Sequence, residues 1–211
     1  MKKIVVAVAL LMLISCAKKK EDIKTTILNY TGTVTVNGKV VASIGQEIKY
    51  GDVIQTGDQS LCELTINEKN ILRLGQKSKL AFNISEKENT IDLVEGWLAG
   101  ITKKITTKDR TYLIKSPTSV AAVRGTSFCT KVEKQNSTYF CVCNGKIELQ
   151  NSKGEITDMV ISPHHSARRY TKEKDGTLSI NKNPGVLYHD DKGLETLAKK
   201  INVTIDWKKA D

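Results

Sequence analysis

Residues 33–41 read Thr-Val-Thr-Val-Asn-Gly-Lys-Val-Val, and this stretch decides the fold class. Valine alternates with threonine over residues 33–36, which is the period of a β-strand with one buried face. Asn37-Gly38 then supplies the two-residue turn that β-hairpins favour, and Val40-Val41 begins a returning strand. The stretch therefore predicts a β-hairpin.

The same pattern continues from Tyr30 to about Tyr170. Further short apolar stretches, separated by polar or glycine-containing turns, lie at 61–66, 71–74, 91–97, 112–114, 126–132, 138–142 and 146–150. Many short strands at spacings of about 8 to 12 residues indicate an all-β sandwich, barrel or solenoid. A helical period occurs only near the C-terminus, where Gly193–Lys200 is expected to form a short helix and Val203–Trp207 a further strand.

The N-terminus has the organisation of an export signal. Two lysines precede the apolar run Ile4–Ile14, which is too short for a bilayer core of roughly 30 Å and fits a secretory signal. The run ends in Leu-Ile-Ser-Cys16, which resembles a bacterial lipobox, in which the cysteine is acylated and the preceding residues are removed. We therefore predict a lipoprotein signal peptide at residues 1–15 and lipidation of Cys16. An ordinary signal peptide cleaved near Ala17 is the alternative.

Lipidation would anchor the chain to a membrane without spanning it. We expect residues 16–27 to form the lipidated N-terminus and a flexible tether, because Ala17–Lys24 is polar and charged. The residue directly after Cys16 is Ala17 and not an aspartate, which resembles the pattern that permits sorting to the outer membrane. These features predict a periplasm-facing protein of the bacterial cell envelope, held by acyl chains such as palmitate, with the outer membrane favoured.

The composition and motifs argue against two classes of function. The formal net charge is +10, but the basic residues are spread along predicted strands and turns, and only 5% of the residues are aromatic. Without a basic helix or interleaved aromatic residues, we predict no nucleic-acid binding. The sequence also has no G-x-S-x-G elbow, H-E-x-x-H motif or phosphate-binding glycine loop. We therefore predict that the protein is not an enzyme.

Several motifs, taken in order, resemble the FecR family. Residues 51–57 (GDVIQTG), followed by Ser60 and Glu63-Leu64, are similar to the family's GD-x-I-x-T…S…E-L segment. Later matches to the family's strands and turns are Leu72, Leu74-Gly75, Ser78, Leu93 and Glu95-Gly96. The most specific stretch is residues 116–128 (SPTSVAAVRGTSF), which resembles T-P-x-A-x-x-x-V-R-G-T-x-F with serine in place of the first threonine. The resemblance covers roughly residues 28–150.

The resemblance implies an all-β domain with a twisted β-solenoid or sandwich architecture. We place this domain at residues 28–170 and expect residues 171–211 to be a C-terminal tail with the short helix. Signalling members of the family carry a cytoplasmic segment and a spanning helix, whereas this chain shows only the predicted signal peptide, so the sigma-factor role is not carried over. We expect a non-enzymatic binding, scaffolding or sensing domain whose partner is an envelope protein or a glycan.

The turn Arg124-Gly125-Thr126 is interpreted as a structural motif. Gly125 is expected to adopt a backbone conformation closed to residues with a Cβ. Arg124 offers five donors in a planar fork that can fasten carbonyls or a carboxylate across neighbouring strands. We therefore expect a buried, structural Arg124 rather than a ligand-binding one.

After the predicted lipidation site four cysteines remain, and three are predicted to share one face of the sheet. Pleating places Cys129 opposite the core-facing side chains of its strand, and Cys141 and Cys143 face the same way on the returning strand. A cross-strand disulfide from Cys129 to Cys141 or Cys143 is one interpretation, because the envelope is oxidising. Cys62 is interpreted as a small buried hydrophobic residue.

A metal site is the competing interpretation. Cys141 and Cys143 present two thiolates on one side of a strand, and His164-His165 could complete a tetrahedral set for a soft or borderline ion. Residues 139–145 and 164–170, with His189-Asp190-Asp191 further on, also resemble a subset of FecR-like proteins with Y-F-C-x-C-x-G and H-H-x-A-x-R-Y elements. This resemblance implies one shared site for a metal ion or haem. The alternative function is therefore a metal- or haem-binding or redox protein of the envelope.

Overall fold

The structure is a computed structural model that describes residues 23–41, 43–85, 88–103, 111–151 and 155–210. The predicted signal peptide, Cys16 and most of the predicted tether lie outside these residues. Within the described ranges, no helix combines the length and the apolar character that crossing a bilayer requires.

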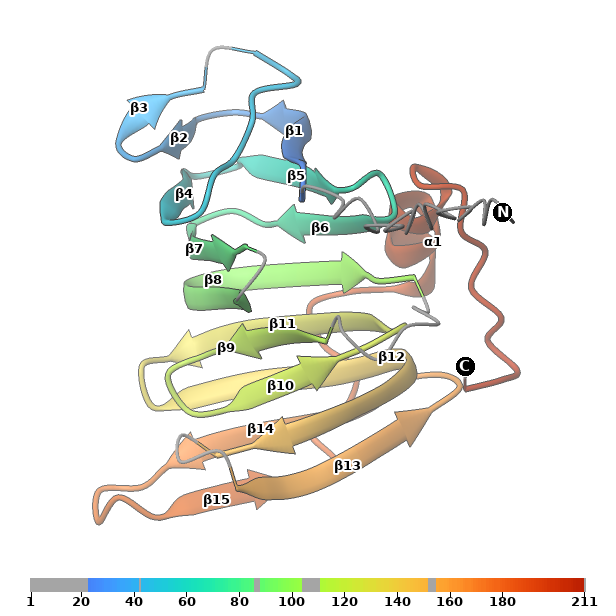
Figure 1. Cartoon of the computed structure of the whole chain (residues 1–211). Coiled ribbons are helices and arrows are strands. Elements are labelled where there is room, and N and C mark those ends of the chain that lie inside the picture. Colours follow the sequence, from blue (N-terminus) through green and yellow to red (C-terminus); the bar gives the residue numbers. More distant parts are fainter. Residues whose placement is uncertain (1–22, 42, 86–87, 104–110, 152–154, 211) are drawn as a thin grey trace, which may run out of the picture.

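The described strands form two layers that share two long strands (Figure 1). The first layer has the order β1 (Thr25–Thr31), β5 (Leu61–Ile66), β6 (Asn70–Leu74), β8 (Asn89–Ile101), β11 (Ser127–Lys134), β12 (Ser137–Gln150), β14 (Ser166–Lys172) and β15 (Leu178–Asn181). The second has the order β3 (Lys39–Val40), β2 (Val34–Val36), β4 (Asp52–Thr56), β7 (Ser78–Ile84), β8, β9 (Tyr112–Lys115), β10 (Val120–Val123), β12 and β13 (Ile156–Ser162). Among these pairings only β8 with β9 is parallel.

The two long strands, β8 and β12, change layers at a glycine. The first half of β8 pairs with β7 in the second layer, and its second half pairs with β6 and β11 in the first layer. The first half of β12 pairs with β11 and β14 in the first layer, and its second half pairs with β10 and β13 in the second layer. Gly96 (φ 88°) and Gly145 (φ 116°) stand at the two change points. A Cβ built on Gly96 would overlap Ser78, and one on Gly145 would lie 3.0 Å from the carbonyl oxygen of Gly125. Glycine is therefore required where each strand bends.

Two apolar clusters stabilise the fold. The larger lies between the layers and is supplied by alternating positions, as in β7, where every second residue is buried. Its aromatic centre is Phe128 against Phe140, with ring centroids 5.9 Å apart. The second cluster lies on the outer face of the first layer and contains Cys129, Cys141 and Cys143. The three thiols thus share a face, as the alternation predicted.

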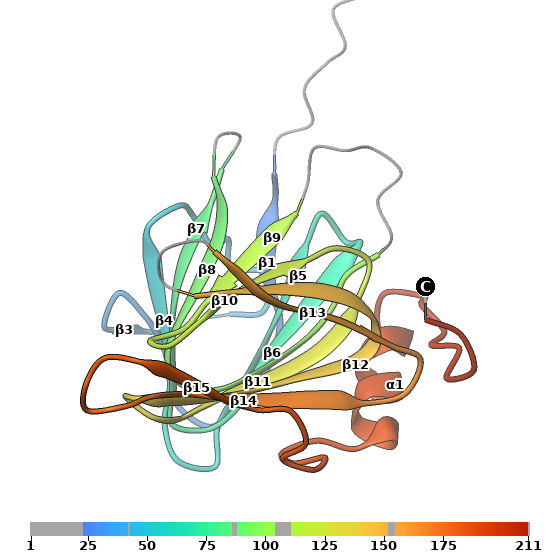
Figure 2. The same cartoon turned by 90° about the horizontal axis from the view of Figure 1, so that it is seen from below.

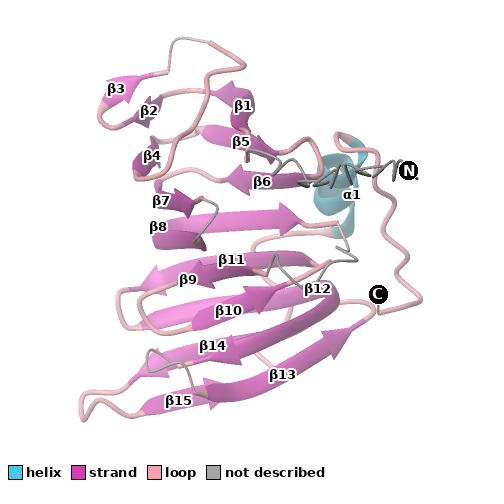
Figure 3. Cartoon of the chain, viewed as in Figure 1, coloured by secondary structure: helices cyan, strands magenta, loops and turns pink. Residues whose placement is uncertain are grey.

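The C-terminal tail covers the second cluster. Helix α1 (Asp191–Lys199) lies outside the first layer, as the view along the stack shows (Figure 2; elements coloured by type in Figure 3). The tail residues buried in the cluster are Leu194, Leu197, Ala198 and Ile201. The Tyr139 hydroxyl donates to the Gly185 carbonyl and accepts from the Leu187 N–H, which fixes the chain ahead of the helix.

The predicted all-β fold and its hairpins are confirmed. Asn37 and Gly38 both have positive φ angles, 52° and 76°, and join β2 to β3 as a two-residue turn. The expected helix is α1, which begins two residues earlier than predicted, with the Asp190 side chain accepting from the Gly193 N–H. The strand expected at Val203–Trp207 is wrong. This segment pairs with no described strand, because its apolar side chains pack on the second cluster while the N–H of Val203 caps α1 at Ala198.

The Arg124-Gly125-Thr126 turn is the corner between β10 and β11. Gly125 has a φ of 62°, and the Thr126 hydroxyl donates to the Lys146 carbonyl while the Thr126 N–H donates to Thr102 Oγ1. Arg124 is exposed, so the expectation of a buried arginine is wrong. The corner places Arg124 at the surface, and Thr126 makes cross-strand hydrogen bonds beside it.

Replacing Gly96 with alanine should destabilise the protein far more than replacing Gly176, which also has a positive φ (85°) but open space around it. Gly176→Ala should cost about 1 kcal/mol, from the left-handed backbone alone. Gly96→Ala should cost about 3 kcal/mol or more, because its Cβ must also displace Ser78, whose hydroxyl accepts from the Trp97 N–H. Urea unfolding of both variants measures the difference, and equal losses would contradict the close-packed corner.

Candidate metal centre

Four metal-binding side chains from three segments meet on the outer face of the first layer. Cys141 and Cys143 lie two residues apart on β12, His165 lies in the turn between β13 and β14, and His189 precedes α1. One donor atom from each of the four lies within 4.8 Å of the other three. Residues distant in the sequence thus form one compact Cys₂His₂ cluster.

The distances between donor atoms suit a tetrahedral ion. Cys141 Sγ lies 3.8 Å from His165 Nδ1, Cys143 Sγ lies 3.3 Å from His189 Nε2, and the two histidine nitrogens are 3.1 Å apart. Zinc–sulfur and zinc–nitrogen bonds of 2.3 and 2.0–2.1 Å would place donors about 3.3 to 3.8 Å apart around a tetrahedron. Donors this close could together hold a single ion.

Both histidines are oriented by a second hydrogen bond. His165 Nε2 lies 2.6 Å from Asp191 Oδ1, and His189 Nδ1 lies 2.6 Å from the carbonyl oxygen of Leu187. Carboxylates and carbonyls only accept, so His165 Nε2 and His189 Nδ1 carry protons, and the opposite nitrogen of each ring faces the thiols. Outer contacts of this kind orient the histidine ligands of metal sites.

The backbone is strained where the two histidines are placed. His165 has a φ of 50° and donates its N–H to the Cys143 carbonyl, and Tyr188, just before His189, has a φ of 68°. Left-handed backbone is unusual for residues with a side chain and is concentrated at functional sites. Both deviations turn an imidazole towards the thiols.

The thiols and imidazoles share charge in a way that favours a cation. A hydrogen bond from Cys143, with further ones from His165 and His189, lowers the pKa of Cys141 to about 3 despite its burial. Burial and the neighbouring Cys141 thiolate raise the pKa of Cys143. Burial disfavours charge on His165, but Cys141 and Asp191 outweigh it and raise its pKa. These shifts favour a thiolate at Cys141 and a neutral thiol at Cys143.

The structure brings together three of the four residues named from the sequence. Cys141, Cys143 and His165 are in the cluster, whereas His164 is 48% exposed and contacts Asp191 through Nε2 at 3.0 Å. His189 takes the fourth position. The sequence signal for His189 was the His189-Asp190-Asp191 element in the tail. The distance from His189 to the cysteines, however, depends on how the tail folds back.

Cys129 lies directly opposite Cys141 in the β11–β12 pairing. Its sulfur accepts a hydrogen bond from Trp97 Nε1 at 2.9 Å, and burial raises the pKa of its thiol. All four described cysteines are thiols in this structure, and the disulfide from Cys129 to Cys141 or Cys143 stays a prediction. Cys62 is buried in the core between the layers, where burial raises its pKa to about 12.

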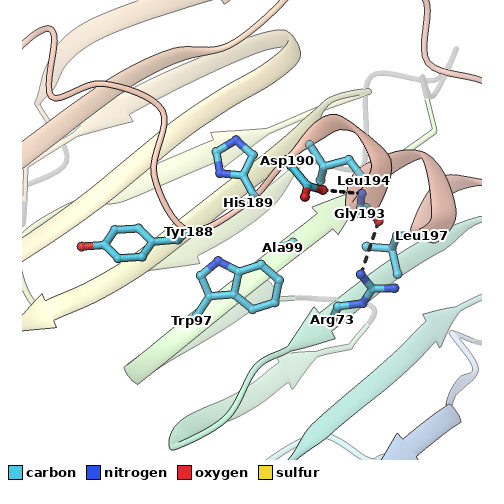
Figure 4. Close-up of a pocket in the computed structure, with 9 residues that line it drawn as sticks. All are labelled: Arg73, Trp97, Ala99, Tyr188, His189, Asp190, Gly193, Leu194 and Leu197. Carbon is cyan, nitrogen blue, oxygen red and sulfur yellow. Dashed lines mark hydrogen bonds between the residues drawn. The ribbon is translucent and has the colours of Figure 1, made fainter.

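A cavity of about 430 Å³ adjoins the cluster, between α1 and the first layer (Figure 4). The Trp97 ring, Ala99, Leu194 and Leu197 form its apolar part, and His189 lines it from the side of the metal centre. Arg73 enters from β6 and donates to the Gly193 carbonyl. The cavity and the cluster therefore share one histidine.

A buried ion pair anchors this end of the tail. Glu63 is only 1% exposed and accepts from Arg73 Nε and Nη2 at 3.0 and 2.8 Å, and Lys200 of the tail makes a further ion pair with it. Two cations around one carboxylate satisfy a buried charge that would otherwise be costly. The sequence showed Glu63 only as part of a motif, because its partners come from a neighbouring strand and from the tail.

Comparison with known proteins places this architecture in a family. Residues 52–148 match the family described as "FecR protein", from the start of β4 into the second half of β12. No curated protein matches. The match includes Cys141 and Cys143 but ends before His165 and His189.

Two crystal structures described as a "putative anti-sigma factor" from Parabacteroides distasonis are similar in fold. The first has a TM-score of 0.46 and 12% identity over 62% of this chain and 59% of that one. The second has a TM-score of 0.47 and 12% identity over 73% of this chain and 80% of that one. The chain thus spans 59% of the length of the first. The match over residues 52–148 shows that this part of the chain is a FecR domain.

Proposed function

We propose that this chain is a non-enzymatic, membrane-anchored sensing or binding protein of the bacterial cell envelope whose FecR domain holds a metal ion. The observation that carries the proposal is the convergence of Cys141, Cys143, His165 and His189 within 4.8 Å, with both imidazoles oriented by outer acceptors. Two sulfur and two nitrogen donors suit Zn²⁺ or a similar borderline ion.

Four protein donors leave a tetrahedral ion without an open coordination position, and catalytic zinc sites keep one open. The centre is therefore suited to holding structure or reporting the presence of an ion rather than to activating water. This supports the non-enzymatic role suggested by the FecR family.

The ion would connect the tail to the FecR domain. Cys141 and Cys143 belong to β12, whereas His189 belongs to the tail that covers the second cluster. Asn144, next to Cys143, donates to the carbonyls of Asp206 and Lys209, so the last part of the tail also packs at the centre. Loss of the ion would weaken the hold on the tail, which is a physical basis for sensing.

A second candidate function is binding or scaffolding that needs no metal. The cavity of about 430 Å³ beside Trp97 favours it, because sites for small ligands have this size and combine apolar side chains with a few polar groups, here Arg73 and His189. The partner would be an envelope protein or a glycan. Replacing Cys141, Cys143 and His165 should spare partner capture under this alternative and abolish it under the metal-dependent one.

The membrane anchor is supported by the lipobox-like Leu-Ile-Ser-Cys16 sequence and by a family that is associated with the envelope. Acyl chains on Cys16 would hold the domain at a membrane, with the outer membrane favoured. The tether would follow as residues 16–27, which lead into β1.

Mature protein made without a histidine tag and purified under reducing conditions should hold about one equivalent of Zn²⁺ or added Co²⁺. Cys141→Ser with Cys143→Ser should remove the ion, because two of the four donors are lost. Cys62→Ala is the matched control, since it removes a buried thiol far from the cluster in the pairing scheme. Elemental analysis and the sulfur-to-cobalt absorption measure binding, and wild-type protein without an ion would refute the centre.

Metal binding should release at least one proton at pH 7 and strengthen as the pH rises. The pKa of Cys143 is raised, so this residue is a neutral thiol before an ion arrives and must lose its proton to bind. The dependence should continue until the pH passes the pKa of that thiol. Calorimetry in two buffers of different ionisation enthalpy counts the protons, and binding without proton release would contradict this charge state.

Labelled palmitate should appear on the wild-type protein made in a bacterial host and should be lost from the Cys16→Ala variant, because the thiol is the acylated group. Cys62→Ala serves as the control that keeps the lipobox-like sequence intact. Equal labelling of wild type and Cys16→Ala would show that the anchor lies elsewhere.

A further inference from the structure

We infer that His164, Asp191 and the outward nitrogen of His165 form a second, outer metal site through which ions reach the buried Cys₂His₂ centre. This inference rests on the proposed metal-binding function and extends it to the route of metal uptake. The ions concerned are borderline divalent cations that accept nitrogen and carboxylate ligands.

The inner centre has no direct exposure to solvent through its thiols. Cys141 and Cys143 are both 0% exposed, and the His165 side chain is only 8% exposed. An ion must nevertheless arrive from water, so the centre needs an access path. On the His165 side of the centre, the exposed groups are His164 and Asp191, whose side chains are 48% and 45% exposed.

The outer residues have the geometry of a labile site. Asp191 Oδ2 lies 3.0 Å from His164 Nε2, and Asp191 Oδ1 lies 2.6 Å from His165 Nε2. Suitable donor atoms of all three residues lie within 4.8 Å of one another. Three protein donors leave coordination positions for water, as in open zinc sites. Such a site can take up an ion and release it again.

His165 belongs to both sites. Its Nδ1 faces the thiols at 3.8 Å from Cys141 Sγ, and its Nε2 faces Asp191. A neutral imidazole has one lone pair and one N–H, so it can ligate an ion on only one side at a time. The outer site is therefore filled before the inner one, and it empties as the ion moves inward.

The movement inward balances its protons. Bonds from the ion to His164, Asp191 and His165 Nε2 would break, and bonds to both sulfurs, His165 Nδ1 and His189 Nε2 would form. The proton of His165 Nδ1 would move to Nε2 by way of water, and protons displaced from the thiols would pass to water. His165 Nε2 then carries a proton again and donates it to Asp191, which is the contact that orients the inner ligand. The same carboxylate thus receives the ion and afterwards supports the filled centre.

Trp207 limits the direction of approach. Its ring lies 4.9 Å from that of His164 and 5.3 Å from that of His165, and its Nε1 is held by Glu195 at 2.9 Å. The indole therefore packs against both imidazoles. The Asp191 carboxylate contacts the Nε2 atoms of the same two imidazoles.

The test compares Co²⁺ uptake by wild type, His164→Ala and the control Lys192→Ala. Lys192 is an exposed neighbour of Asp191, and its removal leaves every proposed ligand in place. Stopped-flow absorbance follows formation of the sulfur–cobalt bonds, and chelator competition gives the equilibrium affinity. A His164→Gln variant repeats the test with a side chain of similar size and polarity.

In wild type and Lys192→Ala, the observed rate should level off at high Co²⁺, because a bound intermediate precedes transfer. In His164→Ala and His164→Gln, uptake and release should both slow about tenfold, which corresponds to about 1.4 kcal/mol of activation free energy. The affinity of the inner centre should stay within about twofold, since its ligands are unchanged.

Unchanged uptake rates in both His164 variants would refute the outer site while leaving the inner centre intact. Failure of wild-type protein to bind Co²⁺ would refute the proposed centre and the outer site together.

Discussion

The fold depends on one steric constraint: at the corners between its layers the backbone comes too close to its neighbours for a Cβ. Gly96 and Gly145 occupy the two bends inside long strands, against Ser78 and against the Gly125 corner. Hydroxyl groups stabilise the same corners, because the Ser78 hydroxyl accepts from the Trp97 N–H and the Thr126 hydroxyl donates to the Lys146 carbonyl of β12. These contacts fix the residue at which each strand enters the next layer. The alternation of side chains from that residue onward decides which of them face the core and which face outward.

On β12 this alternation decides where the two cysteines of the cluster lie. Phe140 and Val142 enter the core between the layers, so Cys141 and Cys143 must face the tail. On that outer face both thiols are buried from water, yet side chains of other segments can contact them. A buried thiolate requires such a partner for its charge. The tail supplies both an apolar cover and the histidine. Structural support and ligand supply are therefore properties of the same segment.

How much could be predicted from the sequence follows from how local each feature is. Strand alternation, the Asn37-Gly38 turn and the common face of the cysteines depend on neighbours along the chain, and all were predicted correctly. Which of His164 and His189 lies beside the cysteines does not depend on local sequence, because it is decided by the left-handed φ at His165 and by how the tail folds back over a long separation. Arg124 and the strand expected near Trp207 failed for a related reason, since tertiary packing decides surface placement and edge pairing.

The contribution of His189 by the tail gives the centre a mechanical meaning. An ion held between β12, the turn at His165 and the tail would act as a removable cross-link that closes long loops, and closing a loop restricts the unfolded chain much as a disulfide does. Unlike a disulfide, such a link can be undone by lowering the free concentration of an ion and needs no reductant. The stability of the contact between the C-terminal tail and the β-sheet would then depend on the concentration of metal ions around the cell.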